Sequence, residues 1–503
     1  MANIFGTADS IFFIGGQGTK AGLTSPGGCT RTWWESEVGA NPTKTDKQNA
    51  LNKLMGVNGE AKFALTNLTY TGSTKQFTVT DSTGVEAGMV AYIAGTGILS
   101  GKYEITDVPD STHITVSGLA YTGNNTNSAV TIGGAFDSLP NAVSSGVLDA
   151  TSYHVNIYTN KNETFTSAVV FGCGGTPHKG TRLCVRGYNE VPGDMDSGGE
   201  YYQSPYDAYL NGIDANAFVL YDNQTSGFTI DISGQYNILL SNLHIKGAVT
   251  GFYGYDFCRG WVLEHCVFSG AYSSRAVDIH KGYYASIFDC YFDGSTYTGS
   301  DQFIRMYNTS MNTIYNNVFV GQTEKDMLCL DGGLIFNNLF VNNRKSILFG
   351  ISDSITTCVA LNNTSYNNSG AAFYNGWVSA TVNWSQVHFL NNLILPVADK
   401  TAWSHAGIGG TAVNIANNCS YRAGGFTNIY GSTAPGVTKN NLEIDPDCKD
   451  IANEDFRPRN PIVLHGGLDG LTGKPAQIGA ILQEYQFASS GRMVKMARLG
   501  ITR

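Results

Sequence analysis

The sequence predicts an all-β protein, a right-handed single-stranded parallel β-helix preceded by a small N-terminal antiparallel β-domain. The main observation is a set of similar short segments between residues 237 and 395, each with apolar residues around a central polar pair. They recur every roughly 20–30 residues, a period typical of solenoids. The seven segments are NILLSNLHI, WVLEHCVF, ASIFDCYF, NTIYNNVF, GLIFNNLF, CVALNNTSY and VHFLNNLIL.

The second residue of each polar pair forms a column of only Asn or Cys. These anchor residues are Asn242, Cys266, Cys290, Asn317, Asn338, Asn363 and Asn392. Each segment is too short for a helix and is rich in β-branched and aromatic residues, which indicates two short strands joined at a bend. Asn tolerates the left-handed backbone of such a bend, and stacked Asn side chains can hydrogen-bond as a ladder. We therefore predict a structural ladder of anchors, and the same alignment places Asn343 in a loop.

The repeat resembles that of the pectate-lyase-like right-handed parallel β-helix superfamily over about residues 150–480. GTRLCVRGYNEVPGD resembles the first coils of that superfamily, and EIDPDCKD, EDFRPRN and AQIGAI resemble its last coils and cap. The stretch GMVAYIAGTGILSGKYEITDVPDSTHITV resembles small β-modules of bacteriophage tail and capsid-decoration proteins. Together these resemblances imply the kind of β-helix found in bacteriophage tailspike and virion proteins.

Composition changes along the chain divide it into four parts. Residues 1–58 are expected to be a docking segment with a short helix at KTDKQNALNKLMG, and residues 59–134 a small β-barrel or sandwich. Residues 135–485 are the β-helix with its cap, and residues 486–503 are a basic tail. Trp33 and Trp34 either plug the end of the solenoid or help to dock the protein. The tail is either a solvated end or an arm that docks on an acidic neighbouring subunit.

Charge and composition exclude some classes of function. The formal net charge is −9 and charged residues make up only 14% of the chain, which argues against nucleic acid as the main partner. No apolar run is long enough to insert in a membrane, and the N-terminus lacks the features of a secretory signal. The ten cysteines have no zinc-ligand spacing. We expect no metal or cofactor, mostly buried thiols, and assembly in a host cytoplasm.

Hydrolysis of sugars needs two carboxylates at a set separation, so acidic residues that share a column of the repeat are candidates for catalysis. Asp278, Arg305 and Asp326 stand twelve residues before their anchors, and Asp256 stands ten before its own. This column is the candidate catalytic set, although an alternating salt ladder explains it more simply. His265 and Asp289 occupy the slot filled by Asn in other segments, so turn chemistry accounts for them.

Two functions follow as hypotheses. The first is a bacteriophage virion structural protein, a tailspike, fibre or capsid-decoration subunit that binds the host surface or a neighbouring virion protein. The alternative is a polysaccharide depolymerase or lyase that acts on host capsule or lipopolysaccharide. A bacterial surface adhesin is disfavoured by the missing signal. Resemblance to tailspikes implies a homotrimer, with exposed aromatics such as Tyr283, Tyr284 and Tyr374 at its contacts.

Overall fold

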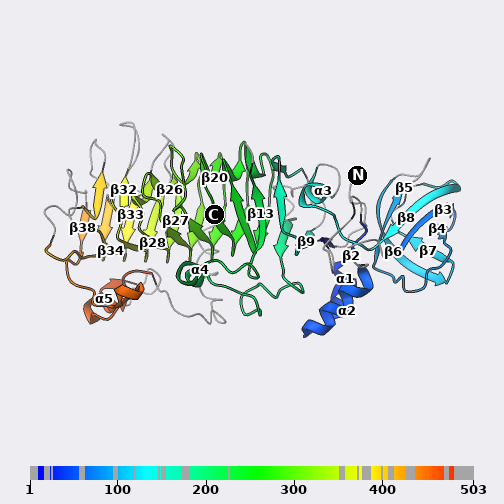
Figure 1. The fold of residues 1–503 in the computed structure, drawn as a ribbon, viewed down its shortest axis with the longest axis horizontal. Coiled ribbons are helices and arrows are strands. Elements are labelled where there is room, and N and C mark those ends of the chain that lie inside the picture. The colour runs from blue at the N-terminus through cyan, green and yellow to red at the C-terminus, as the bar shows by residue number, and fades with distance from the viewer. Residues whose placement is uncertain are drawn as a thin grey trace. The chain divides into compact units, whose positions relative to one another are not determined.

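The computed structural model describes most of the chain, in two compact units of residues 1–272 and 273–503. The described residues are 9–15, 23, 26–55, 63–94, 100–117, 119, 121–144, 148, 154–172, 181–224, 227–349, 357–370, 373–375, 387–397, 400–405, 413–425, 437–468 and 475–480. The protein is mostly strand, and its coils form a right-handed parallel β-helix (Figure 1). The fold class expected from the sequence is confirmed.

The first unit begins with a strand and two helices that pack on the barrel core. β1 (Ser10–Ile14) lies parallel to β9 (Val155–Thr159), and β2 (Cys29–Thr30) pairs with β1. α1 (Arg31–Val38) is capped by the Thr30 side chain, and α2 (Lys44–Leu54) begins with a capping box between Thr43 and Asp46. The helix expected at KTDKQNALNKLMG is therefore confirmed.

Trp33 and Trp34 are buried against this unit. They are 5% and 8% exposed, the Trp33 indole N–H donates to Glu86 at 2.9 Å, and Trp34 packs on Phe13. Both belong to a hydrophobic core that they share with the barrel strands. Both side chains are thus packed inside the first unit, and a docking role for residues 1–58 stays a prediction.

Six antiparallel strands close into a barrel in the order β3-β4-β7-β6-β5-β8. They are β3 (Phe63–Thr71), β4 (Gln76–Thr78), β5 (Val90–Ala94), β6 (Gly101–Asp110), β7 (His113–Val116) and β8 (Asn125–Ile132). Closure leaves no strand edge open to a foreign chain. One lysine, Lys102 on β6, is 1% exposed, and its ammonium group bonds the Pro26 carbonyl oxygen at 2.5 Å. The rings of Phe12, Tyr92 and Phe136 surround it at 5.0–5.6 Å.

Three parallel sheets form the coils of the first unit. One contains β9, β12 (Leu183–Gly187), β15 (Ile238–Ser241) and β18 (Val262–Glu264). A second contains β10 (Glu163–Phe165), β13 (Val219–Asn223), β16 (Leu243–Gly247) and β19 (Val267–Ser269). The third contains β11 (Val169–Val170), β14 (Phe228–Asp231) and β17 (Thr250–Gly254). The long segment 192–212, which we call the flap, leaves the coils after β12 and contains α4 (Pro205–Asn211).

The second unit has three parallel sheets of the same kind. Its first sheet contains β21 (Ser286–Phe288), β24 (Asn312–Tyr315), β27 (Gly333–Phe336), β30 (Cys358–Leu361), β33 (Val387–Leu390), β36 (Val413–Ala416) and β38 (Val437–Lys439). Its second contains β22 (Tyr291–Asp293), β25 (Val318–Val320), β28 (Leu339–Val341), β31 (Thr364–Tyr366), β34 (Leu393–Leu395) and β37 (Cys419–Ser420). Its third contains β20 (Arg275–His280), β23 (Ile304–Tyr307), β26 (Asp326–Leu330), β29 (Lys345–Phe349), β32 (Phe373–Asn375) and β35 (Trp403–His405).

Buried amides run along the corner between the first and second sheets of this unit. Asn317, Asn338, Asn363 and Asn392 are 0% exposed. Each donates its side-chain N–H to the side-chain oxygen of the next at 2.9–3.0 Å, and the series continues to Asn418 and Asn441. Cys290 stands at its start, where its backbone N–H donates to the Asn317 side chain. Every described cysteine is a free, buried thiol.

The expected position of the left-handed bend is wrong by one residue. The left-handed residues are those that precede the anchors, such as Asn316, Asn337 and Asn362, with φ of 54–57°. His265 and Asp289 fall in this column with φ of 48° and 52°, which agrees with the turn chemistry expected for them. Asn242 also belongs here, since its φ is 60° and it follows Ser241, whose register partner is Glu264. Leu243 therefore takes the anchor position in that coil.

Asn343 lies between β28 and β29, outside both strands as expected, but it is a buried corner residue and not an exposed loop residue. Asn343 is 0% exposed, donates to the Phe319 carbonyl oxygen at 2.9 Å and accepts from the Gln322 backbone N–H at 3.0 Å. Its own backbone N–H donates to the Asn368 side chain at 2.7 Å. It follows a left-handed residue, Asn342, just as the anchors do. The corner between the second and third sheets thus repeats the design of the first corner.

Candidate functional site

Asp278 and Arg305 lie side by side on neighbouring strands of the third sheet in the second unit. They are register partners on β20 and β23. The Arg305 guanidinium donates two hydrogen bonds to the Asp278 carboxylate, at 2.9 and 3.1 Å. Alternating apolar residues, Val277, Ile279 and Met306, fill the interior and turn these charged side chains outward. The strand register thus produces a two-pronged ion pair, a strong and directional contact.

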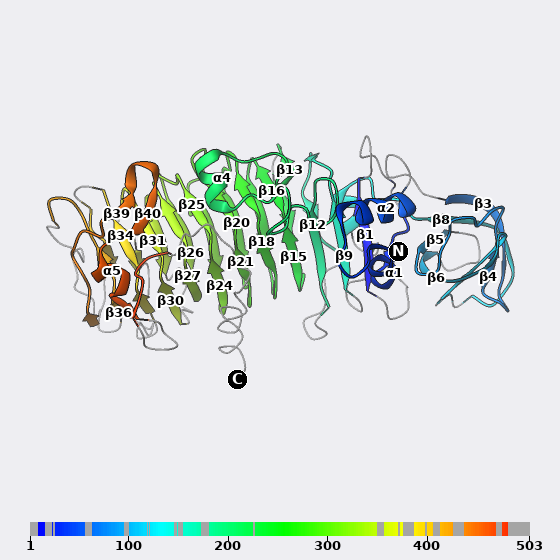
Figure 2. The same cartoon turned by 90° about the horizontal axis from the view of Figure 1, so that it is seen from below.

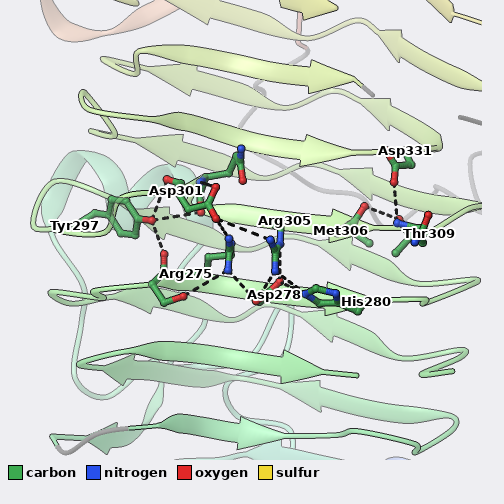
Figure 3. Close-up of polar contacts among 12 residues, drawn as sticks. Arg275, Asp278, His280, Tyr297, Asp301, Arg305, Met306, Thr309 and Asp331 are labelled. Carbon is green, nitrogen blue, oxygen red and sulfur yellow. Dashed lines mark hydrogen bonds and ion pairs between the residues drawn. The ribbon is translucent and has the colours of Figure 1, made fainter. Parts of the chain in front are cut away.

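Three further side chains complete what we call the charge cluster: Arg275, His280 and Asp301 join Asp278 and Arg305 (Figure 3). Arg275 donates to Asp278 at 3.0 Å and pairs with Asp301, and the His280 ring nitrogen is 3.2 Å from Asp278. The side chains of Arg275 and Asp278 are 8% and 7% exposed. Tyr297, from the loop after β22, donates its hydroxyl to the Asp301 carbonyl oxygen at 3.0 Å. The cluster therefore has a buried centre at Arg275 and Asp278, and its outer member Asp301 is 41% exposed.

The partners of Asp278 fix its charge. Burial alone raises the pKa of its carboxyl, but hydrogen bonds from His280 and Arg305 and the charge of Arg275 outweigh burial and leave that pKa below its ordinary value. A general acid in sugar hydrolysis needs the opposite shift, so that it carries a proton at working pH. Asp278 is thus suited to holding two arginines and unsuited to donating a proton.

The other two acids of the expected column do not join this cluster. The register partner of Arg305 on β26 is Cys329, so Asp326 stands three residues away from the column. Its carboxylate is 3.5 Å from the ammonium of Lys345, its register partner on β29. Asp256 belongs to the first unit, where it lies in an exposed turn after β17 with φ of 53°. Counting back from the anchor failed because the corners differ in length from coil to coil.

The first unit holds a second group of charged residues that the sequence columns did not reveal. Arg186, Ser241 and Glu264 occupy one register position on three successive strands, and the Arg186 guanidinium is 3.4 Å from the Glu264 carboxylate. Burial raises the pKa of Glu264, the charge of Arg186 opposes that shift, and Asp196 of the flap adds to it. Asp196 is fixed by the Asn242 side chain, which donates to it at 2.7 Å.

His265 fastens the flap to the coils beside this group. Its ring nitrogens lie 2.8 Å from the Asn242 side-chain oxygen and 2.7 Å from the Gln203 carbonyl oxygen, and its ring stacks on Tyr202. Burial lowers the pKa of His265 to about 4, against the opposing effects of the Gln203 hydrogen bond and Asp196. The other end of the flap is held by α2, where Lys44 pairs with Glu190 and Glu200. The flap is thus an ordered part of the first unit.

The described residues contain no group of three or more His, Cys, Asp and Glu side chains arranged to hold a metal ion. Nor do they include a helix that is both long and apolar enough to cross a membrane.

Comparison with known proteins gives only distant likenesses. No known family matches the sequence, and no curated protein matches it. The structure of XylC with xylose aligns with 78% of this chain and 79% of its own, at 11% identity and a TM-score of 0.31. The tailspike gp61 of Pseudomonas phage phi297 aligns with 77% of this chain and 62% of its own, at 10% identity and a TM-score of 0.26. The tailspike gp49 of Pseudomonas phage LKA1 aligns with 76% of this chain and 63% of its own, at 12% identity and a TM-score of 0.21.

This chain thus spans less than two thirds of the length of either tailspike. Likenesses this distant transfer neither substrate nor role, so the fold rests on the coils themselves, with their three parallel sheets and the buried amides at their corners. By those coils, the chain is a right-handed parallel β-helix protein.

Proposed function

We propose that this chain is a structural protein of a bacteriophage virion, a tailspike, fibre or capsid-decoration subunit that binds the host surface or a neighbouring virion protein. The observation that carries the proposal is the ladder from Asn317 to Asn441, in which each buried amide is paired with the next. Fully satisfied buried networks rigidify a fold and specify one arrangement. Such a body serves as a stiff element in an assembly.

The charge cluster supports a structural role in the same way. Its one deeply buried carboxylate, Asp278, is committed to Arg275, His280 and Arg305. A site that turned over substrate would need that group free to exchange a proton or to attack. The cluster instead joins β20, β23 and the loop that carries Asp301 into one block.

The test is the composition of purified particles. Phage particles are banded by density and their proteins identified by mass spectrometry, with the clarified lysate as the comparison. We expect the chain to co-purify with the particles at a fixed ratio to the major capsid protein. Abundance in the lysate together with absence from banded particles would overturn the proposal.

We extend the proposal to assembly as a homotrimer. Tyr284 is 47% exposed and Tyr283 is partly buried, whereas the side chain of Tyr374 lies outside the described residues. Mass measurement at micromolar concentration should give three chains per particle. A single-chain mass at that concentration would contradict the trimer.

A second candidate function, a polysaccharide depolymerase, is favoured by one observation. Glu264 has a raised pKa and lies near a second carboxylate, Asp196, and an arginine. A raised pKa is the shift that suits a carboxyl group that donates a proton in sugar hydrolysis, and a second carboxylate is the other group that this reaction uses. If the chain cleaves host capsule or lipopolysaccharide, Glu264→Gln should abolish cleavage. Exposed Glu324→Gln is the matched control, and Asp278→Asn tests the cluster expected from the sequence. No cleavage by the unaltered protein across a panel of host glycans removes this candidate.

A further inference from the structure

Two segments lie side by side where the second sheet of the second unit ends. One is β37 with the turn that follows it, and the other runs from residue 441 to 445. The Ser420 backbone N–H donates to the Leu442 carbonyl oxygen at 2.9 Å, and the Leu442 N–H donates to the Asn418 carbonyl oxygen at 2.7 Å. These bonds hold the two segments as neighbours in the manner of adjacent strands.

Segment 441–445 continues into a part of the chain that packs along the second sheet. That part contains β39 (Cys448–Asp450), β40 (Asp455–Pro458) and α5 (Pro461–His465), and it lies beside β31 and β34 (Figure 2). Phe456 packs on Tyr366 of β31 with ring centroids 4.5 Å apart. Segment 441–445 is therefore anchored on both sides.

Residues of both segments line a cavity of about 260 Å³. Its lining residues are Ser420, Tyr421, Arg422, Gly424, Gly425 and Glu443. Ser420 is 2% exposed, whereas Gly424, Gly425 and Glu443 are exposed, so the cavity has a closed floor and an open mouth. Sites for drug-sized ligands measure roughly 300–1,000 Å³. This cavity is therefore suited to a single small ring.

Two glycines leave the mouth of the cavity unfilled. Gly424 and Gly425 have left-handed backbones with φ of 87° and 77°, which side chains rarely adopt. The turn closes where the Gly425 backbone N–H donates to the Arg422 carbonyl oxygen at 3.0 Å. A Cβ atom added at either glycine would meet no other atom within 4 Å. The turn thus favours glycine, and glycine keeps this space open.

Three side chains give the cavity its chemistry. The Arg422 Nε–H donates to the Gly425 carbonyl oxygen at 2.5 Å, which orients the guanidinium. The Tyr421 hydroxyl donates to the Asp445 carboxylate, and this bond raises the pKa of the hydroxyl. Glu443, on the opposite segment, adds an exposed carboxylate. The cavity therefore combines an oriented aromatic ring, a cationic donor and an anionic acceptor.

This combination selects the class of ligand. An anion would be repelled by Glu443 and Asp445, and a cation would be repelled by Arg422. A hydroxyl group suits both charges, because it donates to a carboxylate and accepts from a guanidinium. The Tyr421 ring offers an apolar surface to the C–H groups of a ring-shaped ligand. A neutral sugar residue has hydroxyl groups, C–H groups and the small size that this cavity requires.

We propose, on the basis of the host-surface role proposed above, that this cavity binds one neutral sugar residue of a glycan. Tyr421 packs against the ring of the sugar, and Arg422 and Glu443 bind its hydroxyl groups. The site lies in the last coil, away from the charge cluster and from Glu264.

The test measures binding of sugars to the full chain by saturation-transfer difference NMR. The neutral probes are the methyl glycosides of glucose, galactose, mannose and rhamnose, and glucuronate and glucosamine are the charged comparisons. We expect saturable binding of at least one neutral probe with a Kd on the order of 1 mM, because a single ring makes few contacts. Both charged sugars should bind more weakly than that probe.

Two variants place the binding in this cavity. Gly424→Asn adds a side chain at the mouth, and Asn tolerates the left-handed backbone there, so binding should be lost. Glu443→Gln removes a charged acceptor at an exposed position and should weaken binding roughly tenfold. Glu324→Gln is the matched control, since Glu324 is exposed in the same unit but does not line the cavity. It should bind as the unaltered protein does.

The outcomes separate this site from the virion role. Absence of saturable binding by every neutral probe would overturn the inference, and tighter binding of glucuronate would overturn the neutral class of ligand. Equal binding by Glu443→Gln and the unaltered protein would also overturn it, and this variant decides the matter if Gly424→Asn fails to fold. Sugar binding by a chain that is absent from banded particles would remove the virion role and leave the sugar site in place.

Discussion

The Asn338 side chain donates to the Asn363 side-chain oxygen at 2.9 Å and accepts from the Asn317 side chain at the same distance. It also donates to the carbonyl oxygens of Ile314 and Phe336, both at 3.0 Å. All of this takes place at 0% exposure. One amide therefore links three successive coils, and no water is available to replace it.

We predict that Asn338→Leu is strongly destabilising, because it leaves buried donors and acceptors without partners at about 1–3 kcal/mol for each stranded group. Asn343→Leu should be destabilising for the same reason, since Asn343 serves the second corner. Exposed Thr323→Leu is the control and should stay within roughly 0.5 kcal/mol of the unaltered protein. Thermal or urea unfolding measures all three. A near-zero loss for Asn343→Leu would show that the second corner does not depend on its amide.

Met311 offers a substitution that should stabilise the protein. It is 56% exposed and has a left-handed backbone with φ of 58°, a conformation that disfavours residues with a bulky side chain. Met311→Asn keeps that backbone with a better suited residue, and we expect a gain of up to about 1 kcal/mol. Met311→Leu is the control and should change little. The midpoints of urea unfolding compare the two variants, provided that the unfolding free energy depends equally on urea concentration in both. A lower stability of Met311→Asn would mean that the Met311 side chain makes a necessary contact.

Removing Arg305 should show how much its two-pronged contact with Asp278 contributes to stability. Arg305→Leu leaves the buried Asp278 carboxylate with Arg275 and His280 alone, so we expect a loss smaller than the ~3–5 kcal/mol that a fully broken buried pair costs. Adding Asp278→Asn should recover part of the loss, because the buried charge that lost its main partner is gone. Arg459→Leu breaks an exposed pair with Asp447 and should cost no more than about 1 kcal/mol. If the double variant is no more stable than Arg305→Leu, the buried charge is not the source of the loss.

Lys102 predicts a dependence of stability on pH. Burial lowers the pKa of its ammonium group from 10.5 to about 7 in the folded protein. Because the unfolded chain binds that proton more tightly, the free energy of unfolding should rise as pH increases from 7 to 10.5 and level off below 7. Lys102→Met removes the group, so its advantage over the unaltered protein should be largest at pH 7 and shrink by pH 10. Urea unfolding at both pH values tests this, and a constant difference would contradict it.

The coil positions were readable from the sequence because one physical requirement recurs in every coil. A buried residue after a tight bend must pair its polar groups, and a left-handed residue must precede it, so Asn-Asn pairs such as those at Asn338 and Asn363 repeat. In the coil that contains Asn242, the anchor position is filled by Leu243 and not by Asn or Cys. The predicted anchor was therefore misplaced by one residue there. The second ladder, which joins Gln322, Asn343 and Asn368, was missed because the alignment was anchored on the first corner alone.

Only part of the charge cluster could be predicted from the sequence. Asp278 and Arg305 stand at equal distances before their anchors, and strand register brings them together. Arg275 reaches Asp278 from its own strand, and Asp301 comes from a loop whose path depends on Tyr297 and the Ser274 carbonyl oxygen. Glu264 sits next to the bend residue His265, where its role depends on a flap about 60 residues earlier in the chain. Contacts made by loops do not recur at the spacing of the sequence repeat. Because the repeat was the signal used to align the coils, these contacts could not be predicted from it.

Successive rungs of the amide ladder are separated by 21, 25, 29, 26 and 23 residues, yet each side-chain hydrogen bond in the series measures 2.9–3.0 Å. The different numbers of residues between rungs therefore do not alter the contacts of the ladder. The chain can therefore acquire new segments at a corner, one coil at a time, without a change in the buried contacts between coils. In evolution, and equally in the laboratory, the solenoid can serve as a fixed display frame on which surface segments are exchanged.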